Sequence, residues 1–324
     1  MGGWSVYCAI CGGPFSSNVE IDPEETGDDD GYYRDKVLRG CNLEWLDDVC
    51  GLGINSDAPG NDKSFLSGVG EYWDYVRLLL ARYHNINDHE WPHVFPFHPI
   101  CYKGILLRCI HQGNYEQIRR DILVDVKEDL SEYRNIRLEL NYGEPEPPAE
   151  QVWPSIKGQE VLVVNPVKIP QLDANLAPVM ESFDKQAALD QDSQSQDIFN
   201  RLPAELRHWV FDYLPAGSII ALKAASFAMH TTTLPGEFWK HRLRSQIPWL
   251  WEIHDIDVFQ SQDVEDKASK LLLDIEKKSQ YTSENDDYIF GLANRRRIWG
   301  VCEQIRTRYF EKLQGIANTH SSHS

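Results

Sequence analysis

The sequence contains no apolar run near the roughly 20 residues that a membrane-spanning helix needs. Its first residues lack the basic segment and the long apolar core of a secretory signal. We therefore expect a cytoplasmic or nuclear protein without membrane association, in which the seven cysteines are reduced. An odd number of reduced cysteines suits packing or metal ligation better than a disulfide framework.

Common catalytic motifs are also missing. The sequence has no phosphate-cradling Gly-Lys-Ser/Thr motif and no Gly-x-Ser-x-Gly elbow. Gly51-Leu-Gly53 and Gly68-Val-Gly70 lack the third glycine and the preceding strand of a dinucleotide motif. Since no nucleophile and base converge in the sequence, we expect a protein that is not an enzyme. An enzyme with a cysteine or metal centre in residues 1–185 is the weakest alternative.

Charge is present in excess and is unevenly distributed. The chain carries 32 basic and 50 acidic residues, a net charge of −18. Residues 1–196 hold 16 bases and 33 acids (16 − 33 = −17), whereas residues 197–324 hold 16 and 17 (16 − 17 = −1). The acidic excess repels phosphate backbones and disfavours nucleic-acid binding. The split predicts two regions with different roles.

Residues 1–183 are predicted to form an α+β region. Apolar residues at spacings of three and four predict helices over 40–51, 71–83 and 115–140. The valine-rich run 159–169 predicts a strand. The predicted fold class is therefore mainly α with minor β. Two further cysteines, Cys41 and Cys50, are interpreted as core residues of the first of these helices.

A metal site is predicted near the start of the chain. Cys8 and Cys11 have the spacing at which two thiolates bind one tetrahedral zinc, and Gly12-Gly13 permits a tight turn with backbone N–H groups directed at sulfur. His98-Pro-Ile-Cys101 repeats the two-residue spacing and completes a set of three cysteines and one histidine. We expect structural zinc that joins the start of the chain to this second pair.

Two alternatives to zinc stay open. Cys8 and Cys11 are also explained as small buried hydrophobic residues, with His98 in a loop. Redox use of the Cys-x-x-Cys pair is disfavoured because Gly-Gly-Pro, and not a helix, follows it. His93 and Cys109 are spare ligand candidates.

A polar linker, 184–197, leads to three short predicted helices in 198–248. Pro203 suits the first turn of the first helix, Ser218 is a candidate cap for the second, and Pro235-Gly236 precedes the third. Each helix has an apolar face, and three such helices form a core that is marginal alone. The apolar periodicity of these three helices is equally consistent with an ordinary helical subdomain.

Four motifs lie along this module: Phe199-Asn-Arg-Leu-Pro-Ala-Glu-Leu206, Val210-Phe-Asp-Tyr-Leu214, Leu222-Lys-Ala-Ala-Ser226 and Phe238-Trp239. Together they resemble an F-box. Proteins of the filamentous-fungal F-box type are similar in further places, which are Cys8 to Pro14, His98 to Cys101, Pro248-Trp-Leu-Trp251 and Arg295-Arg-Arg-Ile-Trp299. Phe227 and His230 depart from the family's pattern of a basic residue and an aromatic.

The resemblance implies a non-catalytic substrate receptor of an SCF-type ubiquitin ligase. Its F-box would bind a Skp-family adaptor, which links it to a cullin, and other parts would bind an unknown protein substrate. The implied adaptor-facing and core residues are Leu202, Pro203, Leu206, Val210, Leu214, Leu222 and Trp239. Residues 198–251 hold six bases and three acids (6 − 3 = +3), a sign that suits an acidic adaptor. The alternative is a zinc-stabilised scaffold or regulatory protein whose F-box-like module binds partners without ubiquitin transfer.

Residues 249–314 are predicted to form a C-terminal helical region, followed by a disordered tail over 315–324. Within 294–312, an apolar stripe recurs at helical spacing, made of Ile298, Val301, Cys302, Ile305 and Tyr309. We expect the six basic residues of this segment to cover its solvent side. Contact with the acidic N-terminal region or with an acidic substrate is the alternative, and nucleic-acid binding is the least favoured.

Overall fold

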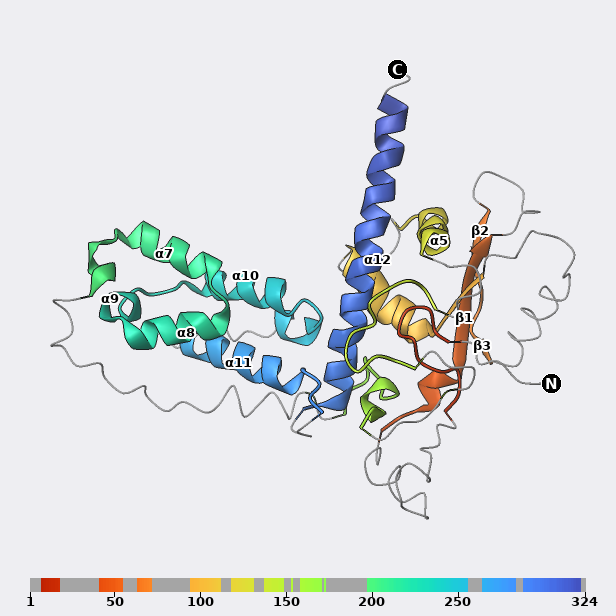
Figure 1. The fold of residues 1–324 in the computed structure, drawn as a ribbon, viewed down its shortest axis with the longest axis horizontal. Helices are drawn as coiled ribbons and strands as arrows, with labels where there is room; N and C mark the ends of the chain where they lie inside the picture. The colour runs from red at the N-terminus through yellow and green to blue at the C-terminus, as the bar shows by residue number, and fades with distance from the viewer. Residues whose placement is uncertain are drawn as a thin grey trace, which may run out of the picture. The chain divides into compact units, whose positions relative to one another are not determined.

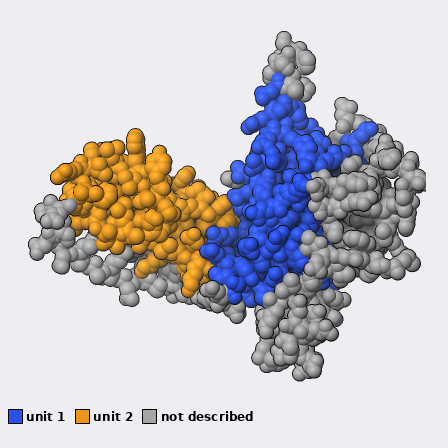
Figure 2. All heavy atoms as spheres, viewed as in Figure 1, with its two compact units in different colours: residues 1–169, 279–324 blue, residues 170–278 orange. Residues whose placement is uncertain are grey.

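The computed structural model of the chain forms two compact units. Unit 1 comprises residues 1–169 and 279–324, and unit 2 comprises residues 170–278 (Figure 2). The residues that the structure describes are 7–17, 41–54, 63–71, 94–111, 118–130, 137–148, 153, 158–170, 172, 197–255, 264–283 and 288–321. None of the described helices is both long enough and apolar enough to cross a membrane.

A small antiparallel sheet lies in unit 1 (Figure 1). Its strands are β1 (Asp48–Ile54), β2 (Ser64–Leu66), β3 (Gly70–Glu71) and β4 (Val94–Phe97). Each of the other three strands pairs with β1, and Cys50 lies opposite Phe97 in the pairing with β4. This register places the end of β4 beside the buried centre of β1, and His98 follows directly.

The helix predicted over 40–51 is wrong. One 3-10 turn, η1 (Glu44–Leu46), precedes β1, so Cys50 is buried on a strand and Cys41 lies half-buried before the turn. Gly51 and Gly53 are poor helix formers. Pairing with β4 supplies backbone partners that a local helix would have supplied instead. The helix predicted over 71–83 lies outside the described residues, apart from Glu71.

The helices of unit 1 gather around one long C-terminal helix, α12 (Phe290–Ser321) (Figure 1). They are the π-helix η2 (Ile100–Leu106), which continues into α4 (Leu107–His111), then α5 (Arg120–Asp129) and the 3-10 turn η4 (Glu160–Leu162). All four contact α12. The predicted apolar stripe of α12 is confirmed, because its members Ile298, Val301, Cys302, Ile305 and Tyr309 are all buried.

The strand predicted over 159–169 is also wrong. After η4 the backbone is irregular, and its carbonyl groups bond to side chains of α12 and not to a neighbouring strand. Asn294 Nδ2 donates to the carbonyl of Val164 at 2.8 Å, and Arg295 Nε donates to that of Pro166 at 2.6 Å. These bonds satisfy buried carbonyls that a sheet would otherwise satisfy.

All regular elements among the described residues of unit 2 are helical. Its elements are η6 (Ile198–Arg201), α7 (Ala204–Tyr213), α8 (Ala216–Ala225), α9 (Phe227–His230), α10 (Gly236–Gln246), η7 (Trp251–Asp255) and α11 (Val264–Lys278). Prolines 203, 215 and 235 occupy the N-cap positions of α7, α8 and α10, where the fixed φ of proline costs nothing. Ser218 therefore lies inside α8 and does not cap it. Trp239 is fully buried in the core.

The fold class predicted from sequence, mainly α with minor β, is confirmed. The two units divide the chain differently from the predicted regions, because the C-terminal region 249–314 is shared between them. Its first helix, α11, contacts α8 and α10 of the three-helix module, while α12 belongs to unit 1. Residues 184–196 of the predicted linker lie outside the described residues. The tail predicted to be disordered is helical up to Ser321.

Candidate metal centre

Cys8 and Cys11 lie on a tight turn between Tyr7 and Pro14, which form an isolated β-bridge. Gly12 N donates to the carbonyl of Cys8 at 2.7 Å, and the φ of Gly12 is 73°, a left-handed value that favours glycine. Cys11 N lies 3.5 Å from Cys8 Sγ, and Gly13 N lies 3.3 Å from Cys11 Sγ. The backbone N–H groups thus point at sulfur, as the sequence predicts, and such bonds favour the thiolate form.

The second pair comes from the junction of β4 and η2. His98 follows β4 directly, and Cys101 lies in the first turn of η2. Ala9 N donates to the carbonyl of Pro96 at 2.9 Å, which holds the Cys8–Cys11 turn against the end of β4. This bond, together with the contact of His98 N with Cys8 Sγ at 3.4 Å, joins the two halves of the site.

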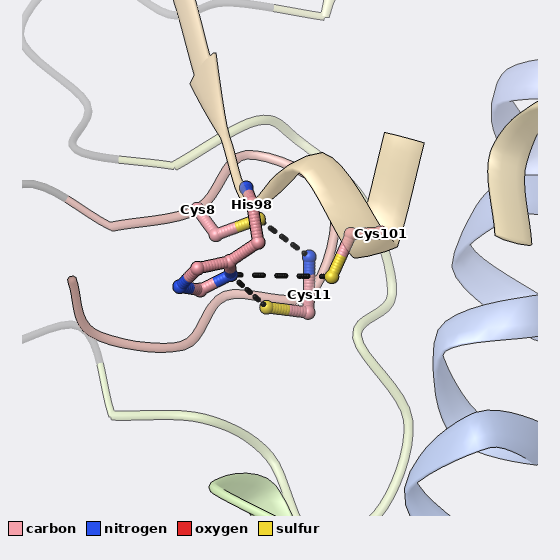
Figure 3. Close-up of side chains that lie close together, drawn as sticks. All are labelled: Cys8, Cys11, His98 and Cys101. Carbon is pink, nitrogen blue, oxygen red and sulfur yellow. Dashed lines mark hydrogen bonds between the residues drawn. The ribbon is translucent and has the colours of Figure 1, made fainter. Parts of the chain in front are cut away.

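The structure brings all four predicted ligands together (Figure 3). Their ligand atoms lie within 4.8 Å of one another. His98 Nδ1 is 3.4 Å from Cys11 Sγ and 3.9 Å from Cys101 Sγ. A tetrahedral zinc ion with ordinary Zn–S and Zn–N bonds separates sulfur from nitrogen by about 3.5 Å. The donor set and its spacing therefore fit a metal ion.

The site is closed. Cys8, Cys11, His98 and Cys101 are each 0% exposed, and four protein ligands fill a tetrahedral coordination sphere. Catalytic zinc sites instead combine three protein ligands with a water or substrate. A metal ion held by these four side chains would therefore have no open coordination position.

The orientation of His98 is fixed by its surroundings. Its Nε2 lies 3.1 Å from the carbonyl oxygen of Pro14, so Nε2 carries the proton and donates to that oxygen. Nδ1 is then the nitrogen that can bind a metal. The rings of Phe15 and Trp45 flank the imidazole, each with its centroid 4.6 Å away. Trp45 Nε1 donates in turn to the carbonyl of Val163 at 3.1 Å.

The four ligands change one another's protonation. Burial acts to raise the pKa of the Cys8 thiol, but side-chain contacts with Cys101 and Cys11 hold it well below its ordinary value. Burial disfavours charged His98, yet the charges of Cys8 and Cys11 raise its pKa to about 10. Burial and the contacts with Cys11 and Cys8 raise the pKa of Cys101 well above its ordinary value. A metal ion that binds all four groups must displace protons from His98 and Cys101.

The prediction that basic residues cover the solvent side of α12 is wrong for Arg295 and Arg297, which are 0% and 7% exposed. Arg297 Nη2 donates to the carbonyl of the ligand Cys11 at 2.9 Å. Arg306 and Arg308 are exposed, as expected. Lys312 Nζ lies 2.8 Å from Asp129 Oδ2, an ion pair with the acidic N-terminal region that matches the alternative interpretation.

The spare ligand candidates do not join the cluster. Cys109 is buried on α4, and burial raises its pKa to about 12, so it behaves as a small core residue. His93 lies outside the described residues.

The implied adaptor-binding residues divide into two sets. Trp239 is 0% exposed and belongs to the core of unit 2. The others lie at least partly exposed on the module, and they are Leu202, Pro203, Leu206, Val210, Leu214 and Leu222. Trp209 and Tyr213, which the sequence analysis did not select, are more exposed still, at 63% and 89%. Their spacing from Leu206, three and seven residues, is the signal that could have revealed them.

Asp197 is a further residue that the sequence analysis missed. Its carboxylate accepts hydrogen bonds from Phe199 N at 2.9 Å, from Ala228 N at 2.9 Å and from Ser226 Oγ at 2.7 Å. Ser226 Oγ in turn accepts from Met229 N, the cap of α9. One side chain therefore caps η6 and joins it to α9. The pattern Asp-x-Phe at the start of η6 is the available signal.

No protein-family model, no curated protein and no solved structure matches the chain.

Proposed function

We propose that the chain is a non-catalytic substrate receptor of an SCF-type ubiquitin ligase, in which the three-helix module binds a Skp-family adaptor. The observation that carries the proposal is an exposed apolar strip along α7. Leu206, Trp209 and Tyr213 are 40%, 63% and 89% exposed, although large apolar side chains are usually buried. Residues three and four apart share one face of a helix, so these three side chains form one surface.

The surroundings of this strip suit a docking surface. Val210 lies four residues after Leu206 on α7 and is half-buried, as are Leu202 before the helix and Leu214 at its end. Trp239, by contrast, is fully buried in the unit. Contiguous exposed apolar patches on a folded unit mark interaction sites. Aromatic residues also dominate the energetics of protein interfaces. A receptor of this kind acts by proximity, because it raises the effective concentration of a bound protein near the ubiquitin-conjugating enzyme.

A pull-down with the full chain tests the receptor proposal. Leu202→Ala combined with Pro203→Ala should abolish recovery of the Skp-family adaptor and of the cullin. Leu273→Ala is the matched control, because Leu273 is also exposed (37%) and lies on α11 of the same unit. The control should recover both proteins. If the wild-type chain recovers neither, the receptor proposal fails.

For the metal centre, we propose zinc in a structural role. The support is the buried set of three cysteines and one histidine, since thiolate and imidazole ligands in a closed four-ligand site suit zinc. Elemental analysis of protein purified without chelators should find about one zinc per chain. A well-folded, metal-free preparation obtained in the same way would refute this part.

The metal centre also favours a second candidate function, a zinc-stabilised scaffold or regulatory protein without ubiquitin transfer. In that case the apolar strip of α7 binds a partner that does not connect to a cullin. The same pull-down separates the two candidates, because the scaffold candidate predicts that the wild-type chain recovers no cullin.

A further inference from the structure

We propose that Arg297 is the buried counter-ion and positioning residue of the metal centre, and that it makes metal binding near the start of the chain depend on the last helix. This inference rests on the proposed metal centre. It adds a residue that is not a ligand, that lies 286 positions from the ligand it contacts, and that acts through that ligand's backbone.

The hydrogen bonds of Arg297 converge on the Cys8–Cys11 turn and its neighbours. Nη2 donates to the carbonyl of Cys11 at 2.9 Å, and Nη1 donates to the carbonyl of Tyr142 at 3.0 Å. Nε and Nη2 also donate to Asn294 Oδ1, at 3.2 and 2.9 Å. Tyr142 closes the arrangement, because its hydroxyl donates to the carbonyl of Ala9 at 3.0 Å. Arg297 therefore binds both the ligand turn, at Cys11, and the segment 141–143, which we call the covering segment.

The charge of Arg297 has no acidic partner among these hydrogen bonds. All of them end on neutral oxygen atoms, and the side chain is buried. An isolated buried charge is costly unless another charge compensates it. The ligand cluster offers negative charge at this place, because Arg297 contacts the carbonyl of Cys11 and interacts electrostatically with the Cys11 side chain.

The cluster needs such a compensation once a metal is bound. Three thiolates and a neutral imidazole around a divalent cation leave one negative charge, and all four ligands are fully buried. One guanidinium ion makes the assembly neutral. The hydrogen bond to the Cys11 carbonyl also holds the ligand turn, in the way that outer residues hold metal ligands elsewhere.

The neighbouring backbone leaves room for this side chain. Gly143 has a φ of 74°, and a Cβ atom there would lie 2.9 Å from Arg297 Cγ. Gln304 of α12 fixes the same segment, since its Nε2 donates to the carbonyl of Asn141 at 2.7 Å. Gly143 therefore leaves space for the Arg297 side chain, and Gln304 holds the covering segment in place.

Arg295 provides a matched control on the same helix. It is also buried, and it also donates to backbone carbonyls, those of Pro166 and Val167. Those carbonyls belong to the segment after η4 and not to the ligand turn. Loss of either arginine should destabilise unit 1, but only loss of Arg297 should weaken the metal site itself.

The test measures the zinc dissociation constant of the folded full-length chain by competition with a chelator. The variants are Arg297→Gln, Arg297→Lys, Arg295→Gln and Arg295→Lys, with folding checked by circular dichroism. We expect Arg297→Gln to weaken zinc binding about 10- to 100-fold. Arg297→Lys should recover part of that loss because it keeps the charge, and both Arg295 variants should stay within about threefold of wild type.

Each outcome decides the proposal. Wild-type zinc affinity in Arg297→Gln, an equal loss in Arg295→Gln, or no recovery in Arg297→Lys would overturn it while leaving the zinc centre standing. If the glutamine variants do not fold, the comparison of Arg297→Lys with Arg295→Lys decides: a selective loss of affinity in the former supports the role, and equal affinities overturn it. If the wild-type chain binds no zinc, both the proposed zinc site and the proposed role of Arg297 are refuted.

Discussion

The Nδ1 atom of His98 lies 3.4 Å from the Sγ atom of Cys11, although the two residues are 87 positions apart in the sequence. The contact links the turn at the start of the chain to the junction of β4 and η2. Because both residues are fully buried, it also links the candidate metal centre to the core of unit 1. Losing the metal should therefore affect the stability of the whole unit.

Replacing a ligand tests this link. Cys11→Ser should abolish stoichiometric zinc and lower the free energy of unfolding of unit 1 by about 4 kcal/mol when free zinc is near a thousandfold above its dissociation constant. Cys41→Ser is the control, because Cys41 is half-buried and lies outside the ligand cluster. Zinc content and urea unfolding check both variants. Full zinc content in Cys11→Ser would contradict the assignment of this ligand.

Metal affinity should rise with pH. In the metal-free protein the pKa of His98 is raised to about 10 and that of Cys101 is raised well above its ordinary value, so both groups hold their protons at pH 7. Zinc must displace both protons, and higher pH removes this competition. Between pH 6.5 and 7.5 the zinc dissociation constant should fall by at least about 100-fold, because His98 and Cys101 together release two protons. Calorimetry in buffers of different ionisation enthalpy counts the protons, and a pH-independent affinity would contradict the arrangement.

The sequence predicted which four side chains come together, because Cys-x-x-Cys and His-x-x-Cys are local patterns typical of metal ligands. It predicted the buried stripe of α12 for a similar reason, since Ile298, Val301, Ile305 and Tyr309 repeat at helical spacing over several turns. Periodicity failed at β1. There the spacing of Leu43, Leu46 and Cys50 matches that of a helix face. The segment is instead a strand, because Cys50 pairs with Phe97, which lies far along the chain.

The burial of Arg295 and Arg297 could not be predicted either. Charged residues are exposed by default, and only the tertiary structure reveals the carbonyl groups that these two bind. The same irregular backbone explains the error over 159–169. A valine-rich run predicts a strand when nothing in the sequence indicates that Asn294 and Arg295 will satisfy its carbonyls.

Asp197 should stabilise the module of unit 2. Asp197→Ala removes the acceptor of three hydrogen bonds and should lower the free energy of unfolding by about 1–2 kcal/mol. Asp197→Asn keeps one acceptor oxygen and should cost less. Urea unfolding at pH 7 measures both, and an Ala variant as stable as the wild type would contradict the capping role.

The same residue predicts a pH dependence. Although burial opposes ionisation, the hydrogen bonds from Ala228 N and Ser226 Oγ keep the pKa of Asp197 below its ordinary value. A carboxylate with a lowered pKa contributes stability that is present above its unfolded pKa, about 3.9, and that is lost as pH falls through the folded value. The difference in stability between wild type and Asp197→Ala should therefore shrink below pH 4. A constant difference would contradict this sign.

Gly143 should be intolerant of any side chain. Gly143→Ala places a Cβ 2.9 Å from Arg297 Cγ at a φ of 74°, where L-residues are strained. We expect a loss of about 1–2 kcal/mol in stability, together with weaker zinc binding because Arg297 must shift. Gly158→Ala is the control, since Gly158 also has a positive φ, 89°, but no atom within 4 Å of the added Cβ. Equal effects on zinc affinity would show that strain alone is responsible.

Two tryptophans of unit 2 should separate binding from folding. Trp209 is 63% exposed on α7, so Trp209→Ala should leave the free energy of unfolding within about 0.5 kcal/mol of wild type. Trp239 is 0% exposed, so Trp239→Ala should cost about 3–5 kcal/mol and unfold much of the unit.

If α7 is the docking surface, Trp209→Ala weakens adaptor binding at least tenfold while its melting curve is unchanged. Surface plasmon resonance with a purified Skp-family adaptor measures the first effect and calorimetry the second. Undiminished binding by folded Trp209→Ala would remove Trp209 from the interface, because an exposed aromatic at its centre should contribute strongly.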